Sequence, residues 1–278
     1  MADRALVLGG GGFTGGAWEI GVLAGLADAG VDLTDADLVV GTSAGAIMGA
    51  RVAAGTPLEE LYEDQTTLRG DEPVLRVPPT VTLRFLWAML LSRTPEATAR
   101  RLGRMALAAR TVPEEEALEA VGTLMPVREW PDRPLRLAAV DARTGEPAAL
   151  HAGSGVDLLR AVAASCALPG VWPPIAVGGR RWIDGGVRST TNADLARGHG
   201  RVVVLAPIPK GPGGVGAARH AAELRADGTE VALLTPDAAA RRAFGRDALD
   251  PVRRAACARA GRAQAAAYAE AVAEVWHD

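Results

Sequence analysis

A short glycine-rich turn holds the serine that is best placed in this sequence to act as a nucleophile. Residues 41–45 read Gly-Thr-Ser-Ala-Gly, which fits the pattern Gly-x-Ser-x-Gly, and they separate an apolar stretch from a helical one. In this pattern the serine stands on a sharp turn from strand to helix, and small neighbours let the turn close. The helix amides and dipole behind it favour developing negative charge. The pattern predicts acyl transfer through Ser43; the alternative is a tight turn with an ordinary serine.

A run of four glycines, residues 9–12, has competing interpretations. As an oxyanion loop, it would present the amides of Gly10, Gly11 and Gly12 to the negative oxygen of a tetrahedral intermediate. As part of a Gly-x-Gly-x-x-Gly pattern, it would make the chain a nucleotide-binding oxidoreductase, with an acidic residue after the second strand to hold the ribose. Residues 41–43, Gly-Thr-Ser, occupy that position, which disfavours a nucleotide. A purely structural loop is the third interpretation.

An aspartate followed by two glycines is the candidate base. Asp184 comes directly after the apolar pair Trp182-Ile183, and the two glycines let the chain turn and leave the carboxylate at a strand end. Aspartate is a weak base in water because its pKa is about 3.9, but burial beside Ser43 would raise that pKa. A triad would need a histidine, and none of the four, at positions 151, 199, 220 and 277, lies in a suggestive motif. Alone, Asp-Gly-Gly is more typical of an Asx-type turn than of a catalytic site.

The elements that must position these residues alternate between strands and helices. The chain begins with two units of apolar strand, glycine turn and helix, which favours a parallel sheet covered by helices. We expect an α/β fold and one domain over residues 1–278, with a helical insertion at about 71–133 and a helical tail at about 237–278. The expected strands are 6–8, 38–40, 135–140, 148–151, 182–183, 202–206 and 231–234, and the expected helices include 17–29, 81–91, 97–109 and 156–164.

Composition and charge exclude several classes of protein. Apolar residues make up 49% of the 278 residues, and a formal charge of −3 gives no reason to expect nucleic acid as a partner. The two cysteines form no Cys-x-x-Cys pair, which favours a reducing compartment. We see no signal peptide and no stretch near the ~18 apolar residues of a membrane span, so a cytoplasmic location is expected. Metal-binding motifs are missing from the sequence as well, so we expect neither a metal nor another cofactor.

The glycine run, the serine turn and Asp-Gly-Gly, in this order, resemble the patatin-like phospholipase family. Residues 164–174, Ala-Ser-Cys-Ala-Leu-Pro-Gly-Val-Trp-Pro-Pro, resemble the serine- and proline-rich block that precedes the family's aspartate. Residues 140–147, Val-Asp-Ala-Arg-Thr-Gly-Glu-Pro, resemble the strand and turn before that block. The resemblance covers roughly residues 4–210. It implies a three-layer α/β/α sandwich with a mostly parallel central sheet.

The resemblance also implies a chemistry. The chain would be a serine acyl hydrolase of lipid carboxylic esters, of phospholipase A, lysophospholipase or esterase type, acting through an acyl-enzyme. Ser43 would be the nucleophile and Asp184 the base of a Ser-Asp dyad. The amides of Gly10, Gly11 and Gly12 would form the oxyanion hole.

One residue departs from the family pattern. Where the family usually has Arg or Lys, two residues after the glycine run, this chain has Thr14, so a fixed positive charge is missing there. A catalytically weak lipid-binding or regulatory protein on the same fold therefore remains an alternative. The expected partner is a lipid or acyl ester, with peripheral membrane contact as a further expectation. Head group, acyl chain length and oligomeric state stay open.

A strongly apolar segment lies within the expected insertion. Residues 81–91 read Val-Thr-Leu-Arg-Phe-Leu-Trp-Ala-Met-Leu-Leu, which is too short to span a bilayer and contains only two polar side chains. One interpretation is a helix that packs on the core. The other is that part of it lines an acyl pocket or touches a lipid surface, with Phe85, Trp87 and Met89 as the contacts.

Overall fold

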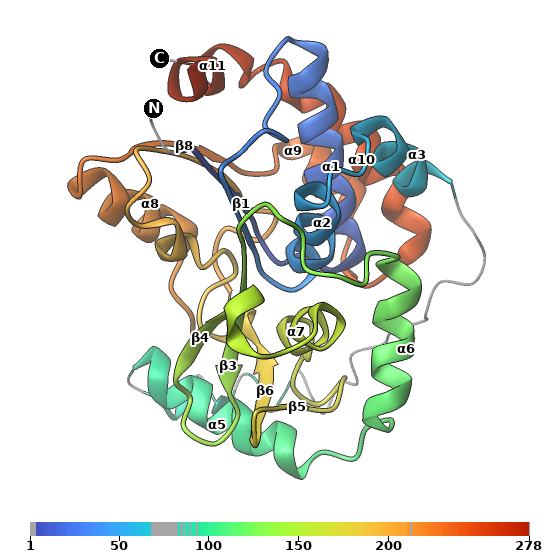
Figure 1. Ribbon diagram of the computed structural model, residues 1–278, viewed down its shortest axis with the longest axis vertical. Coiled ribbons are helices and arrows are strands. Elements are labelled where there is room, and N and C mark those ends of the chain that lie inside the picture. The colour runs from blue at the N-terminus through green and yellow to red at the C-terminus, as the bar shows by residue number, and fades with distance from the viewer. Residues whose placement is uncertain are drawn as a thin grey trace.

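A central β-sheet organises the protein (Figure 1). The computed structural model describes residues 4–67, 83, 85, 87, 88, 90–92, 94–211 and 213–277. Eight strands of these residues form one sheet in the order β5-β6-β3-β2-β1-β7-β8, with β4 paired to β3. The strands are β1 (Arg4–Leu8), β2 (Leu38–Gly41), β3 (Leu135–Asp141), β4 (Pro147–Leu150), β5 (Ile175–Val177), β6 (Arg180–Asp184), β7 (Arg201–Leu205) and β8 (Glu230–Leu234).

The sheet is mostly parallel, as expected. Strands β8, β7, β1, β2 and β3 pair in parallel, whereas β4 and β6 run antiparallel to β3, and β5 runs antiparallel to β6. Antiparallel strands need only short connections, and β5 and β6 are joined by the two glycines of residues 178–179. Strand β5 was not expected from the sequence, because its three residues are too few to show an alternating pattern.

Helices cover both faces of the sheet, which confirms the three-layer architecture. They are α1 (Gly12–Asp28), α2 (Ala44–Ala53), α3 (Leu58–Thr66), α5 (Pro95–Ala108), α6 (Glu114–Leu124), α7 (Leu158–Ser165), α8 (Ala217–Ala226), α9 (Ala238–Phe244), α10 (Arg254–Ala265) and α11 (Ala269–His277). In Figure 1, α8 lies to the left of the strands, and α1, α2 and α10 lie to the right.

The side chains of β1 alternate between the two faces of the sheet and contact the helical layer on each face. Leu6 and Leu8 are fully buried in a cluster with α1 and α10, whereas Ala5 and Val7 are buried in a second cluster with α8. Successive side chains of a strand point to opposite faces, so a strand that is apolar throughout must be covered on both. The five-residue run Arg-Ala-Leu-Val-Leu thus requires both helical layers.

Helix α10, in the expected helical tail, packs closely along α1. A Cβ atom at Gly21 of α1 or at Gly261 of α10 would overlap the backbone of the partner helix, so glycine permits the approach at both positions. Trp18 is fully buried and donates from Nε1 to Gln264 Oε1 at 3.0 Å. The tail is therefore part of the core beside the glycine run.

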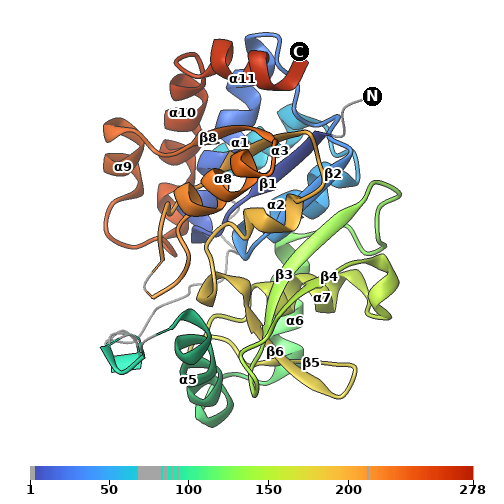
Figure 2. The ribbon, with the colours of Figure 1, turned by 90° about the vertical axis from the view of Figure 1, so that its left-hand side faces the viewer.

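The expected insertion contributes α5 and α6. Helix α5 lies at the end of the molecule opposite α11, and both Figure 1 and Figure 2 show this. Residues 83, 85, 87, 88 and 90 are helical, as the sequence predicts for this segment, whereas Met89 lies outside the described residues. None of the described helices is both long and apolar enough to cross a membrane.

Candidate active site

Ser43 and Asp184 are brought together because two strands meet end to end along one edge of β3. Strand β2 runs parallel to β3 and stops where Gly41 pairs with Leu137. Strand β6 runs antiparallel to β3 and stops where Asp184 pairs with Ala139, two residues further on. Strand β4 takes the opposite edge of β3. The carboxyl ends of β2 and β6 therefore face each other across a short gap, and the serine turn continues directly from β2.

Ser43 has the backbone conformation of a strained turn. Its φ is +54° and its ψ is −120°, and it is one of two non-glycine residues with positive φ in the described part of the chain. Such a conformation costs about 1–3 kcal/mol and persists only where the surroundings enforce it. The Ser43 N–H donates to Ser165 Oγ at 3.0 Å, and the Ser43 carbonyl accepts from Cys166 Sγ at 3.2 Å. The end of α7 therefore holds both backbone groups of the serine.

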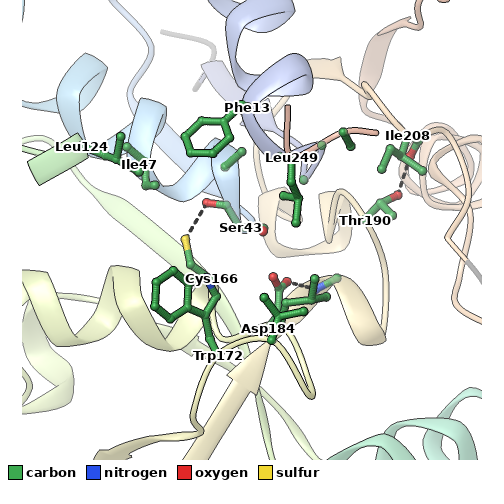
Figure 3. Close-up of a pocket in the computed structure, with 18 of the residues that line it drawn as sticks. Phe13, Ser43, Ile47, Leu124, Cys166, Trp172, Asp184, Thr190, Ile208 and Leu249 are labelled. Atoms are coloured by element: carbon green, nitrogen blue, oxygen red, sulfur yellow. Dashed lines mark hydrogen bonds between the residues drawn. The ribbon is translucent and has the colours of Figure 1, made fainter. Parts of the chain in front are cut away.

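Asp184 is a buried carboxylate that faces the serine. Only 3% of it is exposed, and its Oδ1 accepts from the Gly186 N–H at 2.7 Å. Burial raises the pKa of Asp184 to about 6, and hydrogen bonds from the Gly186 N–H and the Ser43 side chain offset part of that rise. Figure 3 shows the two side chains pointing toward each other. A carboxylate with this pKa is largely ionised at neutral pH and is a stronger base than a solvated aspartate.

The glycine run lies beside Ser43, but its amides differ in availability. The Gly10 N–H donates to the Thr190 carbonyl at 2.7 Å. Gly11 and Gly12 stand at the start of α1, where helix amides have no intrahelical acceptor. Gly12 also has φ +60°, a region that favours glycine. Among the described residues, the Gly10 amide has an acceptor and the amides of Gly11 and Gly12 have none, so of the three amides expected to form an oxyanion hole these two are free to donate.

Thr14, which stands where the family usually has a basic residue, is buried and holds a segment of the tail. Its N–H donates to the Ala248 carbonyl at 3.2 Å, and its side chain is fully buried. The same tail segment places Leu249 close to Ser43 and Asp184 (Figure 3) and Arg246 at the wall of the cavity. The tail, rather than the glycine loop, therefore carries an arginine toward the site.

A large cavity opens over Ser43 and Asp184. Its volume is about 630 Å³, within the range of small-molecule sites. Apolar side chains from α2, α6 and the 168–172 loop line much of it, including Ile47, Val121, Leu124, Leu168 and Trp172. Phe85 lines it too, as the sequence analysis anticipated, whereas Trp87 is not among the lining residues and is 55% exposed. The structure thus places Phe85 at the cavity and Trp87 at the surface, and the contact of either residue with an acyl chain or a lipid surface stays a prediction.

None of the four histidines lines this cavity. His151 caps a short turn, where its Nδ1 accepts from the Gly153 N–H, and His199 lies near the Ala196 carbonyl. His220 is buried beside Asp194, at 3.4 Å. Asp64 and Asp247 also line the cavity, but Asp184 is the carboxylate that shares a hydrogen bond with the Ser43 side chain. Within the described part of the chain, no three His, Cys, Asp or Glu residues cluster so as to hold a metal ion.

No sequence pattern assigned a role to the individual residues that surround Ser43 and Asp184. Ser165 and Cys166 belong to the block 164–174, whose family resemblance was the available signal. Burial, followed by the nearby Asp184 charge, raises the pKa of Cys166 well above its usual value, so its thiol stays protonated and donates. No sequence pattern pointed to Asn192, because its hydrogen-bond partners are distant in sequence. Its Nδ2 donates to Thr42 Oγ1 at 3.1 Å and to the Gly185 carbonyl at 3.2 Å.

The fold and the site together define an α/β protein in which a glycine turn at the end of a strand presents a serine to a buried carboxylate. The sequence pattern of the patatin-like phospholipases matches residues 6–197, which include the glycine run, Ser43 and Asp184. The chain belongs to this family. A comparison with curated proteins finds no match.

Two solved structures are similar in part. The type III effector protein ExoU is 17% identical, with a TM-score of 0.42, over 98% of this chain and 53% of that one. VipD from Legionella pneumophila is 13% identical, with a TM-score of 0.38, over 67% of this chain and 46% of that one. The chain thus spans about half the length of either structure.

Proposed function

We propose that the chain hydrolyses carboxylic esters of lipids, with Ser43 as the nucleophile and Asp184 as the base. The observation that carries this proposal is the placement of a buried carboxylate, with its pKa raised to about 6, against the serine of a strained turn. Membership of the patatin-like phospholipase family and the apolar cavity above the pair support a lipid as the substrate.

The reaction follows from the groups present. Ser43 Oγ attacks the ester carbon while its proton moves to Asp184, and the carbonyl oxygen becomes an oxyanion. The amides of Gly11 and Gly12 donate to that oxyanion, assisted by the positive end of α1. The intermediate collapses to an acyl-enzyme, and the alcohol leaves with the proton from Asp184. Water then attacks the acyl group, Asp184 takes the water proton, and the fatty acid leaves as Ser43 regains a proton.

Labelling with a fluorophosphonate tests the nucleophile directly. We expect Ser43 to be the modified residue and Ser43→Ala to abolish both labelling and ester hydrolysis with an unchanged circular dichroism spectrum, because one hydroxyl in a turn contributes little stability. A folded Ser43→Ala variant that keeps more than about a tenth of the wild-type kcat would exclude the assignment. A panel of phospholipids, lysophospholipids and simple esters then ranks the substrates.

Substitution of the histidines distinguishes a Ser-Asp dyad from a triad with a histidine base. We expect Asp184→Asn to be nearly as damaging as Ser43→Ala, and the four single histidine variants to keep substantial activity. An inactive but folded histidine variant would replace the dyad by a triad. If no ester in the panel is hydrolysed although the protein binds lipid, the chain is a binding protein on this fold.

A further inference from the structure

One helical segment of the insertion exposes an apolar stripe. Of the six large apolar side chains that are exposed among the described residues, four lie between positions 83 and 91. Leu90 is 79% exposed, and Leu83, Trp87 and Leu91 are each 55% exposed. These positions are i, i+4, i+7 and i+8, so they share one face of a helix. Isolated exposed apolar residues are common, but such a contiguous set marks an interaction site.

The opposite face of the same segment packs on the protein and reaches the active-site cavity. Ala88 is buried in a cluster with Leu102 of α5 and Ile183 of β6, and Phe85 packs against that cluster. Phe85 also lines the cavity that contains Ser43 and Asp184. The segment therefore has one face toward the cavity and one face toward solvent.

Arginines border the apolar stripe. A groove of about 470 Å³ lies between this segment and α5, and Trp87, Leu91, Arg101 and Arg104 are among its lining residues. An adjoining groove is lined by Ala97, Arg100, Arg101, Arg104 and Arg143. Among the residues that the structure describes, no aspartate or glutamate lines either groove. Within the described part of the chain, Arg101 and Arg104 have no ion-pair partner.

This local charge is opposite in sign to that of the whole protein. The formal charge of the chain is −3, so the protein as a whole is repelled by an anionic surface. Apolar side chains flanked by arginines are the combination that binds at the interface of an anionic bilayer, where the apolar groups enter the acyl boundary and the cations meet the headgroups. The charge pattern thus favours a lipid surface over a neutral apolar partner.

We propose that the apolar stripe (Leu83, Trp87, Leu90 and Leu91) and the arginines Arg101 and Arg104 form a docking surface for anionic lipid bilayers. Docking places the segment that contains Phe85 between the bilayer and the cavity, so an acyl chain enters beside it. The inference rests on the proposed function only in that the bilayer supplies the substrate; binding itself needs no catalysis.

Vesicle binding by the Ser43→Ala protein tests the docking surface independently of hydrolysis. We expect sedimentation with vesicles that contain phosphatidylglycerol and phosphatidylcholine in equal parts, and much weaker binding to phosphatidylcholine alone or at high salt. Leu90→Asp should lower the partition coefficient about tenfold or more, because a charge replaces a side chain that enters the acyl boundary. The double variant Arg101→Gln/Arg104→Gln should lower it about tenfold on the anionic vesicles only.

Matched changes on other helices control for net charge. Ala222→Asp on α8 matches Leu90→Asp in charge, and the double variant Arg242→Gln/Arg259→Gln on α9 and α10 matches Arg101→Gln/Arg104→Gln; all three control positions are exposed, and both controls should leave vesicle binding unchanged. In the active protein, Leu90→Asp should hydrolyse short soluble esters at the wild-type rate, since Leu90 does not line the cavity. Leu83→Asp repeats the test at a second stripe position, with circular dichroism as the folding control.

Two results would overturn the proposal. One is vesicle binding by Leu90→Asp and Leu83→Asp equal to that of the Ala222→Asp control. The other is a dimer, seen by light scattering, that Leu90→Asp dissociates while the parent protein does not bind vesicles; the stripe is then a self-association surface. If the protein with Ser43 intact binds vesicles but hydrolyses no ester, the proposed function is contradicted, whereas the docking surface is not.

Discussion

The side-chain amide of Asn192 donates to the Thr42 hydroxyl at 3.1 Å and thereby joins the loop after Asp184 to the turn that carries Ser43. The same amide donates to the carbonyls of Gly185 and Ser189, at 3.2 and 2.6 Å. Asn192 is 1% exposed and has φ +47°. One buried side chain therefore fixes the position of the nucleophile turn relative to the candidate base.

We expect Asn192→Asp to lower kcat about tenfold to a hundredfold with little change in KM, because small misplacements of reacting groups cost that much. Aspartate tolerates positive φ as asparagine does, so this variant removes donors without adding backbone strain. Asn192→Ala adds the strain and should also lower the free energy of unfolding by about 2–4 kcal/mol. Kinetics and thermal melting of the two variants check this; a kcat loss that only follows the melting temperature would reduce Asn192 to a structural residue.

The pKa of Asp184 predicts opposite pH dependences for activity and stability. The folded-state pKa of about 6 lies above the usual 3.8, so the stabilisation from the protonated carboxyl is complete below about pH 3.8 and is lost as the pH rises through 6. Ionised Asp184 is thus destabilising, whereas the base reaction needs it ionised. We expect kcat/KM to rise with an inflection near pH 6.

Asp184→Asn should separate the two effects. The variant should lose hydrolysis yet unfold with a free energy up to about 3 kcal/mol higher than wild type at alkaline pH, with the gap closing in acid. Denaturant titrations at a series of pH values measure this. A gap that does not depend on pH would show that Asp184 is not held with a raised pKa.

The glycine run offers a contrast between two neighbouring amides. Proline at Gly11 removes an amide that is free to reach the oxyanion, and we expect kcat to fall at least a hundredfold. The Gly10 amide already donates to Thr190, so its loss acts through the loop. A depsipeptide replacement of each amide by an ester, made by semisynthesis, isolates the donor. Equal kcat losses at Gly10 and Gly11 would contradict this division of roles.

Phe85 and Trp87 should differ in their effect on acyl chain length. Phe85 lines the cavity and Trp87 does not. We expect Phe85→Ala to lower kcat/KM for long, dispersed acyl chains about tenfold more than for short ones, because it removes apolar contact with the distal methylenes. Trp87→Ala is the control and should leave the chain-length profile unchanged in the absence of a bilayer. The measurement is kcat/KM over a series of soluble esters, with melting temperature as the check on folding.

The fully buried Glu19 should tolerate substitution by glutamine. The side chain lies within α1, and burial raises its pKa well above the usual value, with only part of that rise offset by the Gly9 N–H. Burial therefore favours the neutral carboxyl, and the stability that goes with the neutral form is lost as the pH rises through that raised pKa. Glu19→Gln has nearly the same shape and should keep activity while losing that pH dependence, as thermal melting across pH would show. Marked destabilisation of Glu19→Gln at pH 7 would mean that the buried group is charged.

Local patterns in the sequence were sufficient to predict the strands that carry the site and to single out Ser43, whereas Asp184 was singled out only with the help of the family resemblance. Apolar runs followed by glycines predicted β1 and β2, and the Gly-x-Ser-x-Gly spacing singled out Ser43, because a sharp strand-to-helix turn tolerates only small neighbours. Helix α1 begins at Gly12, five residues earlier than expected. Glycine is a poor helix former, and only tight packing keeps this turn helical: a Cβ atom at Gly15 would lie 2.9 Å from Pro207.

The tertiary structure decided everything that depends on residues far apart in the chain. The Asp184 carboxylate is a candidate base because β6 runs back along β3 to meet β2, and burial at that junction raises its pKa to about 6. Ser165 and Asn192 contact the serine turn from far away in the chain, so no local pattern predicted these contacts. The hydrogen bond from the Thr14 N–H to the Ala248 carbonyl was unpredictable for the same reason. The segment 83–91 was equally ambiguous, because apolar composition alone does not say which face is covered. Packing on α5 covers Ala88 and leaves Trp87 and Leu90 in solvent. A sequence specifies local turns through the conformational limits of single residues, whereas burial and side-chain partners exist only once the distant segments have packed.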